Sequence, residues 1–223
     1  MVSVYRVDSQ RKKNLFGNFS INTNIIIFNL ILFVVFTILL GAELISIDSI
    51  AIKPSNILAG EYLWTFFTSM FMHAGFFHLF ANMFSLFFIG GLAQRILGVK
   101  RFLYFYLISG LFAGLLFVLS GLIFPSDMNT YAVGASGALF GLVGFLMIIT
   151  PNLPVYIMFI PIPIKMKYAA PGILVVLWLI SIAGDVPIGN MAHLGGLIVG
   201  VIYGIYLRNR YKNKTRMINR HFS

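Results

Sequence analysis

Long apolar blocks separated by shorter polar stretches run through most of the chain. A helix needs about 20 mostly apolar residues to cross the hydrocarbon core of a membrane, and shorter helices serve where protein or water covers one end. Six blocks meet this requirement, so the pattern predicts an all-α membrane protein built as a bundle of six transmembrane helices. The predicted spans are 21–41, 73–93, 102–123, 134–150, 168–184 and 190–207.

The segments between these spans differ in length and character. The stretch 42–72 is too long for a turn and is rich in aromatic residues such as Trp64 and Phe67, so we expect it to lie at the membrane interface. Prolines break the chain between the fourth and fifth spans. We expect a cytoplasmic N-terminal segment at 1–20, a six-helix domain at 21–207 and a basic cytoplasmic tail at 208–223.

Composition agrees with a membrane protein and narrows the possible chemistry. Hydrophobic residues make up 59% of the chain and charged residues 10%, and the mean hydropathy is +0.93. A soluble domain carries about 25% charged residues. The absence of cysteine excludes disulfides, thiolate metal ligands and cysteine nucleophiles. No small-residue cleavage site follows Leu40, so we expect the first span to be retained.

The net charge of +10 is distributed in a way that predicts orientation. Lys and Arg concentrate on the cytoplasmic side of short loops. We therefore expect both termini in the cytoplasm, contact with the lipid bilayer, some attraction to anionic lipid, and no nucleic-acid partner. Beyond the basic N-terminal segment, the residues expected inside are Arg95, Lys100, Arg101, Lys165, Lys167, Arg208, Arg210, Lys212, Lys214, Arg216 and Arg220. Those expected outside are Lys53, Glu43, Asp48, Glu61, Asp127 and Asp185.

Three of the predicted spans carry strongly polar side chains near their outer ends. The second span contains His73, His78 and Asn82, the fourth contains Ser136, and the sixth contains His193. Polar groups within spans are costly and usually mark function. All three spans run from outside to inside, so we expect His78, Ser136 and His193 at one depth, a little below the outer surface.

Together these groups suit acyl transfer by a serine nucleophile. The Ser136 hydroxyl needs a base to take its proton, and the neutral imidazole of His193 suits that role near pH 7. His78 and Asn82 lie four residues apart on one helix face, and both can donate to an oxyanion, as can the Ser136 N–H at a helix start. No acidic residue lies inside a span, so we expect a Ser–His dyad.

Glycines and one aromatic residue provide the expected support for this site. Gly134 and Gly137 flank the serine, and Gly196 belongs to a repeat of glycines at every fourth position of the sixth span. Small residues at this spacing let helix backbones approach closely, as a hydrogen bond between the two spans requires. Phe140 lies one turn below the serine on the same face, where it can pack beneath the histidine ring.

Each of these signals, taken alone, has a plainer interpretation. A Gly-Ala-Ser-Gly string within a span is more typical of helix packing, and His193 could be a core histidine bonded to a carbonyl. His73 and His78 lie five residues apart with no acidic neighbour, which does not fit a His-Glu-x-x-His zinc motif, and we expect no metal. The polar cluster of the second span could also line a transport pathway.

The order and spacing of the motifs resemble those of the rhomboid intramembrane serine proteases. The resemblance covers about residues 20–207 and rests on His73-x₄-His78-x₃-Asn82, Gly134-Ala135-Ser136-Gly137 and Ala192-His193-x-Gly195-Gly196. It implies a compact six-helix bundle whose short fourth helix starts in a water-filled cavity open to the outside. It also implies an interfacial first loop at 42–72 and a mobile lateral gate at the fifth span.

The resemblance assigns a role to each polar residue. It implies Ser136 as nucleophile, His193 as general base, His78 and Asn82 as oxyanion-hole donors, and His73 as a structural residue beside the site. It implies transmembrane protein substrates, often with a helix that unwinds near the outer face, and no cofactor. A non-catalytic protein of this fold that binds membrane clients is the alternative.

Two positions depart from the family pattern. Trp64 is followed by Thr65 where the family often has arginine, and Gln94 stands where it often has glutamate. We therefore expect the first loop to lack the contacts that the arginine makes. The short tails favour a prokaryotic plasma membrane, and the sequence leaves the oligomeric state, the substrate and the cleaved bond open.

Overall fold

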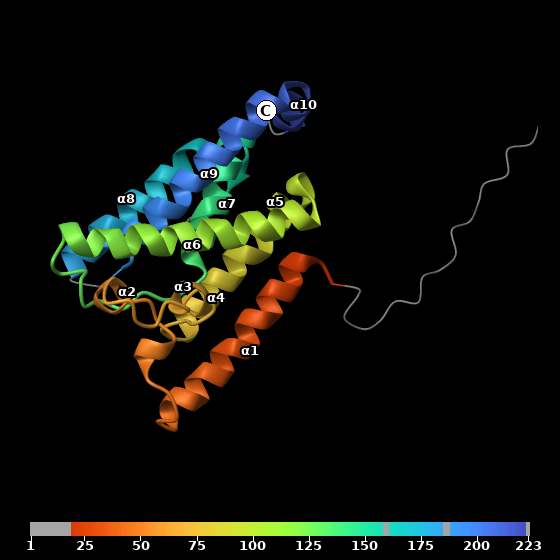
Figure 1. Cartoon of the computed structure of the whole chain (residues 1–223). Helices are drawn as coiled ribbons and strands as arrows, with labels where there is room; N and C mark the ends of the chain where they lie inside the picture. Colours follow the sequence, from red (N-terminus) through yellow and green to blue (C-terminus); the bar gives the residue numbers. More distant parts are fainter. Residues whose placement is uncertain (1–18, 158–160, 185–187, 222–223) are drawn as a thin grey trace, which may run out of the picture.

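Figure 1 shows the computed structural model of the protein, which describes residues 19–157, 161–184 and 188–221. Most of the predicted N-terminal segment and Asp185 lie outside the described residues. The principal helices are α1 (Ile21–Gly41), α4 (Phe76–Ser85) continued by the π-helical η3 (Leu86–Gly90) and α5 (Gly91–Leu97), α6 (Val99–Ile123), α7 (Ser136–Ile149), α8 (Met166–Gly184), α9 (Asn190–Arg210) and α10 (Lys212–His221).

The long helices confirm the prediction of an all-α membrane protein. Within the described chain, five helices are long and apolar enough to cross a membrane: α1, the continuous α4–η3–α5 helix, α6, α8 and α9. The predicted fourth span corresponds to α7, which is apolar but has 14 residues. Two short strands, β1 (Pro154–Val155) and β2 (Ile164–Lys165), pair antiparallel in the proline-rich connection between α7 and α8.

The second predicted span starts later than expected, and the placement of His73 within it was wrong. α4 begins at Phe76 because Gly75, directly before it, has an extended backbone (φ 164°, ψ 173°) that a helix interior does not adopt. His73 therefore lies in the connection that precedes the helix. The same span ends at Leu97, four residues beyond the predicted 93.

Gln94 and the π-helical turn η3 connect this second span to the start of α1. The Asn22 backbone N–H donates to Gln94 Oε1 (2.7 Å), and the Asn22 side chain donates to the Leu86 carbonyl (2.9 Å). The first N–H groups of a helix lack intrahelical partners, a π-helical turn interrupts the α-helical hydrogen-bond pattern, and in a membrane the groups left over need partners within the protein. Gln94 provides the acceptor for the Asn22 N–H at the start of α1.

α7 lies within the bundle, and its surroundings account for its short length. It packs against α6, α8 and α9, and most of its residues are buried (Figure 1). In α1, by contrast, the buried residues are Asn22, Ile25 and Asn29. A helix enclosed by protein on its sides and ends need not match the full thickness of the hydrocarbon core.

The first loop contains three short helices and packs against the segment that precedes α7. These helices are η2 (Ile47–Ser49), α2 (Pro54–Leu58) and α3 (Thr65–Thr68). Ile52 and Ala132 exchange backbone hydrogen bonds (3.1 and 2.9 Å) in an antiparallel bridge, and the Gly134 N–H donates to the Ser69 carbonyl (2.8 Å). The loop thus supports the chain just before Ser136.

Thr65 and Trp64 brace the loop through contacts within it. Thr65 is fully buried, and its Oγ1 donates to the Tyr62 carbonyl (2.7 Å). The Trp64 indole N–H donates to the Ser49 carbonyl (2.9 Å). These bonds join α3 to the preceding turn and to η2, so the loop is held although threonine stands where the family often has arginine.

A polar cluster ties the first loop to the α6–α7 connection. Asp48 Oδ1 accepts from Asn56 Nδ2 (2.7 Å) and from the Tyr131 hydroxyl (2.9 Å), and Lys53 Nζ lies 3.8 Å away. The hydrogen bond from Asn56, together with Tyr131 and Lys53, lowers the pKa of Asp48 against an opposing effect of burial. The carboxylate therefore stays ionised at neutral pH, where it accepts from both sides.

Candidate active site

Ser136 is the first residue of α7, and the chain turns sharply just before it. Gly134 has φ +117°, a conformation that residues with side chains rarely adopt. The Leu139 N–H donates to the Ala135 carbonyl (3.0 Å), so the amides of Ser136 and Gly137 precede the helical hydrogen-bond ladder. The serine hydroxyl and amides outside that ladder therefore lie at the same end of α7.

The Ser136 hydroxyl meets the His193 imidazole between α7 and α9. Ser136 Oγ lies 2.8 Å from His193 Nε2, which is a hydrogen-bond distance. His193 lies in the first turn of α9, and 8% of it is exposed. When Nε2 accepts the hydroxyl proton, neutral imidazole carries its own proton on Nδ1. Nδ1 is buried and has no hydrogen-bond partner among the described residues, so no acid there orients the ring.

Phe140 holds the plane of the histidine ring. The two ring centroids lie 4.6 Å apart with 22° between the planes, a stacked arrangement. Phe140 in turn packs with Leu174 of α8 and Leu197 of α9. The Phe140 ring of α7 thus restricts the rotation of the imidazole. In a catalytic triad, a third polar residue has this role.

The His78 imidazole lies beside the serine, with Gly134 between them. A Cβ on Gly134 would be 2.8 Å from His78 Nε2 and 3.8 Å from Ser136 Oγ. The Ala74 backbone N–H donates to His78 Nδ1 (3.4 Å). A neutral imidazole that accepts at Nδ1 carries its proton at Nε2, so the donor of His78 is on the side of Gly134.

Asn82 and His73 lie around His78. Asn82 is buried, and its Nδ2 donates to the His78 carbonyl (2.8 Å), which leaves its second amide hydrogen for another acceptor. No hydrogen bond in the described part of the chain joins Asn82 to Ser136. The His73 ring is buried against that of His78, with centroids 5.2 Å apart. The His73 ring therefore supports the position of the His78 imidazole by packing against it.

Glycines set the close approach of α7 and α9. A Cβ on Gly196 would overlap the Gly137 carbonyl oxygen, and one on Gly200 would overlap the Gly141 carbonyl oxygen. Gly137 is equally confined, because its Cβ would lie 2.6 Å from the Ala113 Cβ of α6. The backbones of the two helices are therefore in direct contact one turn below the Ser136–His193 hydrogen bond.

We expect Gly196→Ala to lower the free energy of unfolding by about 1–3 kcal/mol, as overpacking of a dense interior does. The new methyl group meets backbone, which cannot move aside as a flexible side chain can. The measurement is unfolding in mixed detergent micelles. Gly172→Ala in α8 is the matched control, because its Cβ would meet nothing within 4 Å, and we expect a gain of at most about 1 kcal/mol. Equal losses in both variants would contradict the packing argument.

Backbone contacts that sequence reasoning missed complete the site. The Ser69 carbonyl holds the Gly134 N–H, and the Ile52–Ala132 bridge fixes the residues before it. Main-chain groups are the same in every residue, so the sequence contains no signal for these contacts. Within the described ranges, no three or more His, Asp and Glu residues lie together in a way that could hold a metal ion.

The fold and the site define an integral membrane protein that encloses a hydrogen-bonded serine and histidine among its helices. Comparison with known families agrees with this description: a model of the rhomboid domain matches residues 60–210. The chain belongs to the rhomboid family.

Individual relatives support the same membership. The chain is 36% identical over 170 residues to RHOMBOID-like protein 1 of Arabidopsis thaliana, covering 74% of the chain and 40% of that protein. It is 35% identical over 162 residues to RHOMBOID-like protein 6, mitochondrial, of Arabidopsis thaliana, covering 70% and 48%. It is 28% identical over 209 residues to Rhomboid-like protease 1 of Toxoplasma gondii, covering 90% and 69%.

The chain spans 40% and 48% of the two plant relatives, so it corresponds to only part of their length. These relatives come from a plant and a protozoan, and one is named mitochondrial. They give no support to the expectation of a prokaryotic plasma membrane, which stays a prediction, as does the cytoplasmic location of both termini.

Proposed function

We propose that this protein is an intramembrane serine protease that hydrolyses peptide bonds in or near the transmembrane helices of other membrane proteins. The observation that carries the proposal is the 2.8 Å contact between Ser136 Oγ and His193 Nε2. It joins a nucleophile to a base within hydrogen-bond reach, as general-base activation of a hydroxyl requires.

In the first half of the reaction, Ser136 Oγ attacks the carbonyl carbon of the scissile peptide while His193 Nε2 takes the hydroxyl proton. The carbonyl oxygen becomes an oxyanion, for which His78 Nε2–H, the Asn82 amide and the Ser136 N–H are the proposed donors. The carbon–nitrogen bond then breaks, and the leaving amine takes the proton from His193. An ester between substrate and Ser136 remains.

In the second half, water attacks the carbonyl carbon of this ester while His193 takes a proton from the water. The bond between carbon and Ser136 Oγ breaks, and Oγ recovers its proton from His193. The acid product leaves and the free enzyme is restored, with no cofactor. Phe140 holds the imidazole in plane through both transfers, because stacking replaces the orienting acid of a triad.

A second function is the binding of membrane clients without cleavage, by the same fold. The chain spans less than two thirds of the two plant relatives named above, and their names specify no activity. A polar pathway for solute transport is the third, since His78, Asn82 and His193 are polar groups within the membrane region. The hydrogen-bonded serine and histidine favour the protease.

A serine-directed fluorophosphonate probe separates these functions without knowledge of the substrate. The protease should be labelled in mild detergent, with the adduct mapped by mass spectrometry to the peptide that contains Ser136, because His193 raises the nucleophilicity of that hydroxyl alone. Protein denatured before the probe is added serves as the control and should not react. Absence of labelling on folded protein would favour the client-binding function.

A further inference from the structure

Most of the described positive charge lies at one end of the bundle and has no acidic partner. Apart from Lys53, every described Lys and Arg lies at the α5–α6 junction, in the α7–α8 connection or the first turn of α8, or along the end of α9 and α10. No described Asp or Glu lies in these segments, and the ion pair found among described residues joins Lys53 to Asp48 in the first loop. This end of the bundle therefore carries an excess of positive charge that the described residues do not neutralise.

A pocket of about 350 Å³ lies at this end, between the end of α7, the end of α9 and α10. Its lining has an apolar side, from the end of α7 and the residues just after it, and a basic side from α9 and α10. The residues that define these two sides are Ile148, Ile149 and Pro151 on the apolar side, and Arg208, Lys212 and Arg216 on the basic side. An apolar wall beside three cations suits a molecule that has a phosphate next to hydrocarbon.

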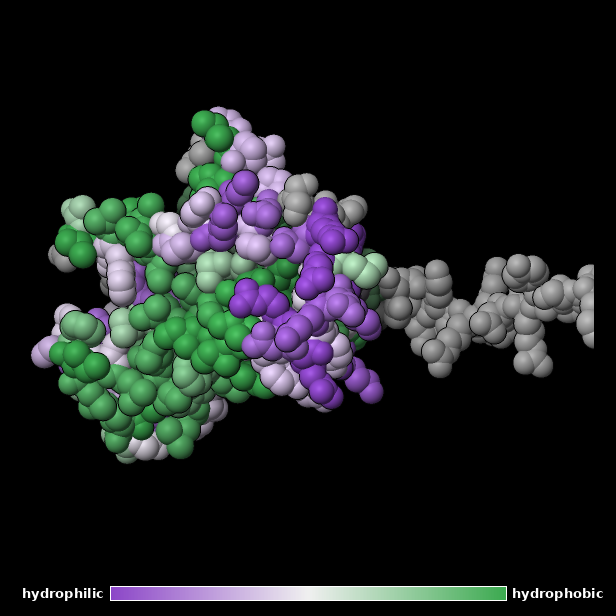
Figure 2. Space-filling model, turned by 90° about the horizontal axis from the view of Figure 1, so that it is seen from above, coloured by the Kyte–Doolittle hydropathy of each residue, from purple (hydrophilic) through white to green (hydrophobic). Residues whose placement is uncertain are grey.

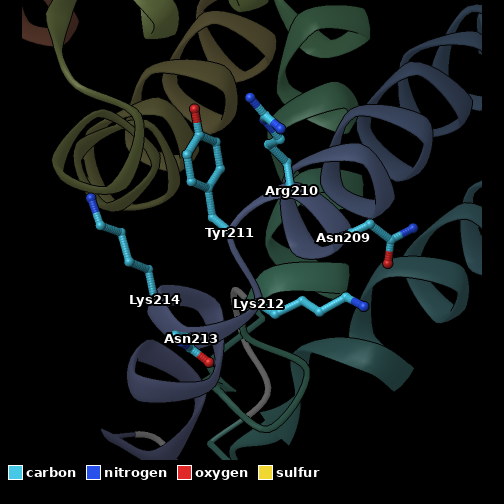
Figure 3. A pocket seen from close by; sticks show the side chains of 6 residues that line it. All are labelled: Asn209, Arg210, Tyr211, Lys212, Asn213 and Lys214. Atoms are coloured by element: carbon cyan, nitrogen blue, oxygen red, sulfur yellow. The ribbon is translucent and has the colours of Figure 1, made fainter.

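A second hollow, of about 430 Å³, opens beside the same turn of the chain and is lined by residues 209–214. Figure 3 shows that Lys212 and Lys214 extend in different directions from the start of α10, while Arg210 and Tyr211 lie on the preceding turn. Lys212 lines both hollows. The first turn of α10 is therefore surrounded by cations.

The local electrostatics of α10 favour a bound anion. α10 has ten residues, begins with Lys212, and has no acidic residue in its first turn. The N-terminus of a helix carries a positive partial charge and unpaired N–H groups, so cations there are unfavourable unless an anion compensates them. Figure 2 shows the hydrophilic residues gathered in a patch that borders the broad hydrophobic surface of the bundle. The anion would thus be met at the level of lipid headgroups.

We propose that the pocket between α7, α9 and α10 binds the phosphate of an anionic phospholipid, held by Arg208, Lys212 and Arg216, with its glycerol and first methylene groups against Ile148 and Pro151. The site lies at the opposite end of α7 from Ser136, about 21 Å away for 14 residues at 1.5 Å each. It is independent of the proposed catalysis, and its test needs no cleavage assay.

The test is the affinity of purified protein in non-ionic detergent for phosphatidylglycerol and for phosphatidylcholine, measured by native mass spectrometry. Wild-type protein should retain phosphatidylglycerol in preference. Each Lys or Arg at an anionic lipid surface contributes about a factor of five, so the double variant Lys212→Gln, Arg216→Gln should bind phosphatidylglycerol about 25-fold more weakly. The exchange Lys212→Arg, Arg216→Lys should keep the affinity and the melting midpoint.

The matched control is Arg95→Gln, Lys100→Gln, which removes the same charge at the α5–α6 junction and should leave the affinity unchanged. An equal loss in this control would overturn the site in favour of long-range attraction by the whole basic end. Equal retention of phosphatidylcholine would overturn the requirement for an anion. Displacement of phosphatidylglycerol by an equal concentration of soluble glycerophosphate would identify the ligand as a soluble phosphate and overturn the lipid.

Discussion

Ser136→Ala is expected to reduce cleavage of a single-span membrane substrate to the background of the assay. Oγ is the atom that would bond to the substrate, and the chain has no cysteine that could replace it. In an unrelated serine protease, loss of the nucleophile lowers kcat by about 10⁶, and loss of nucleophile and base together costs little more. His193→Ala and the double variant should therefore be as inactive as Ser136→Ala. The measurement is gel analysis of substrate incubated with purified protein in liposomes.

Ser109→Ala is the matched control for this prediction. Ser109 lies in α6, is fully buried, and its Oγ has no hydrogen-bond partner among the described residues, so its loss removes a hydroxyl from the same bundle without touching the dyad. We expect wild-type cleavage from this variant. Cleavage retained by Ser136→Ala would remove the mechanism, and loss in Ser109→Ala would show that the assay reports the integrity of the bundle.

The helical class and the positions of His78, Ser136 and His193 near the starts of their helices were predictable because both follow from local patterns. The length of an apolar block predicts a helix, and the position of Ser136 or His193 within its block predicts how near the helix start it lies. Neither prediction needs knowledge of a long-range contact. The spacing of the glycines in α9 likewise indicates a close helix contact. Each of these signals is contained in a single stretch of sequence, whereas the 2.8 Å contact between Ser136 Oγ and His193 Nε2 joins two helices.

The start of α4 and several hydrogen bonds could not be predicted, because they depend on backbone conformation or on residues distant in the sequence. His73 lies in an apolar, aromatic stretch that continues into α4, so hydropathy extends the span to it, whereas the extended backbone of Gly75 makes the helix begin only at Phe76. The Ser69–Gly134 bond is made by main-chain atoms. In the sequence, Asn22 is an ordinary polar residue at the start of a span. Its hydrogen bonds to Leu86 and Gln94 depend on the second span, which contains the π-helical turn η3.

His78→Phe should lower kcat by about 10²–10³ while KM changes little, which is the effect of losing one oxyanion-hole donor. The tautomer of His78 determines which of its ring nitrogens can donate. Nδ1 of His78 accepts from the Ala74 N–H, so the ring proton is on Nε2, beside Gly134 and within the space that Ser136 Oγ also borders. Phenylalanine keeps an aromatic ring, slightly larger than imidazole, against His73 and removes both ring nitrogens, including the acceptor of the Ala74 N–H. Steady-state cleavage of the same substrate provides both constants.

His78→Gln is the paired variant, because its side-chain amide can supply an N–H where the imidazole did. A donor role predicts that glutamine restores most of the kcat lost in His78→Phe, whereas a packing role predicts the reverse, since phenylalanine is the better replacement for a partly buried ring. Melting midpoints of both variants in detergent show whether either one loosens the bundle. A phenylalanine variant as active as wild type would exclude His78 from the oxyanion hole and leave Asn82 and the Ser136 N–H as the donors.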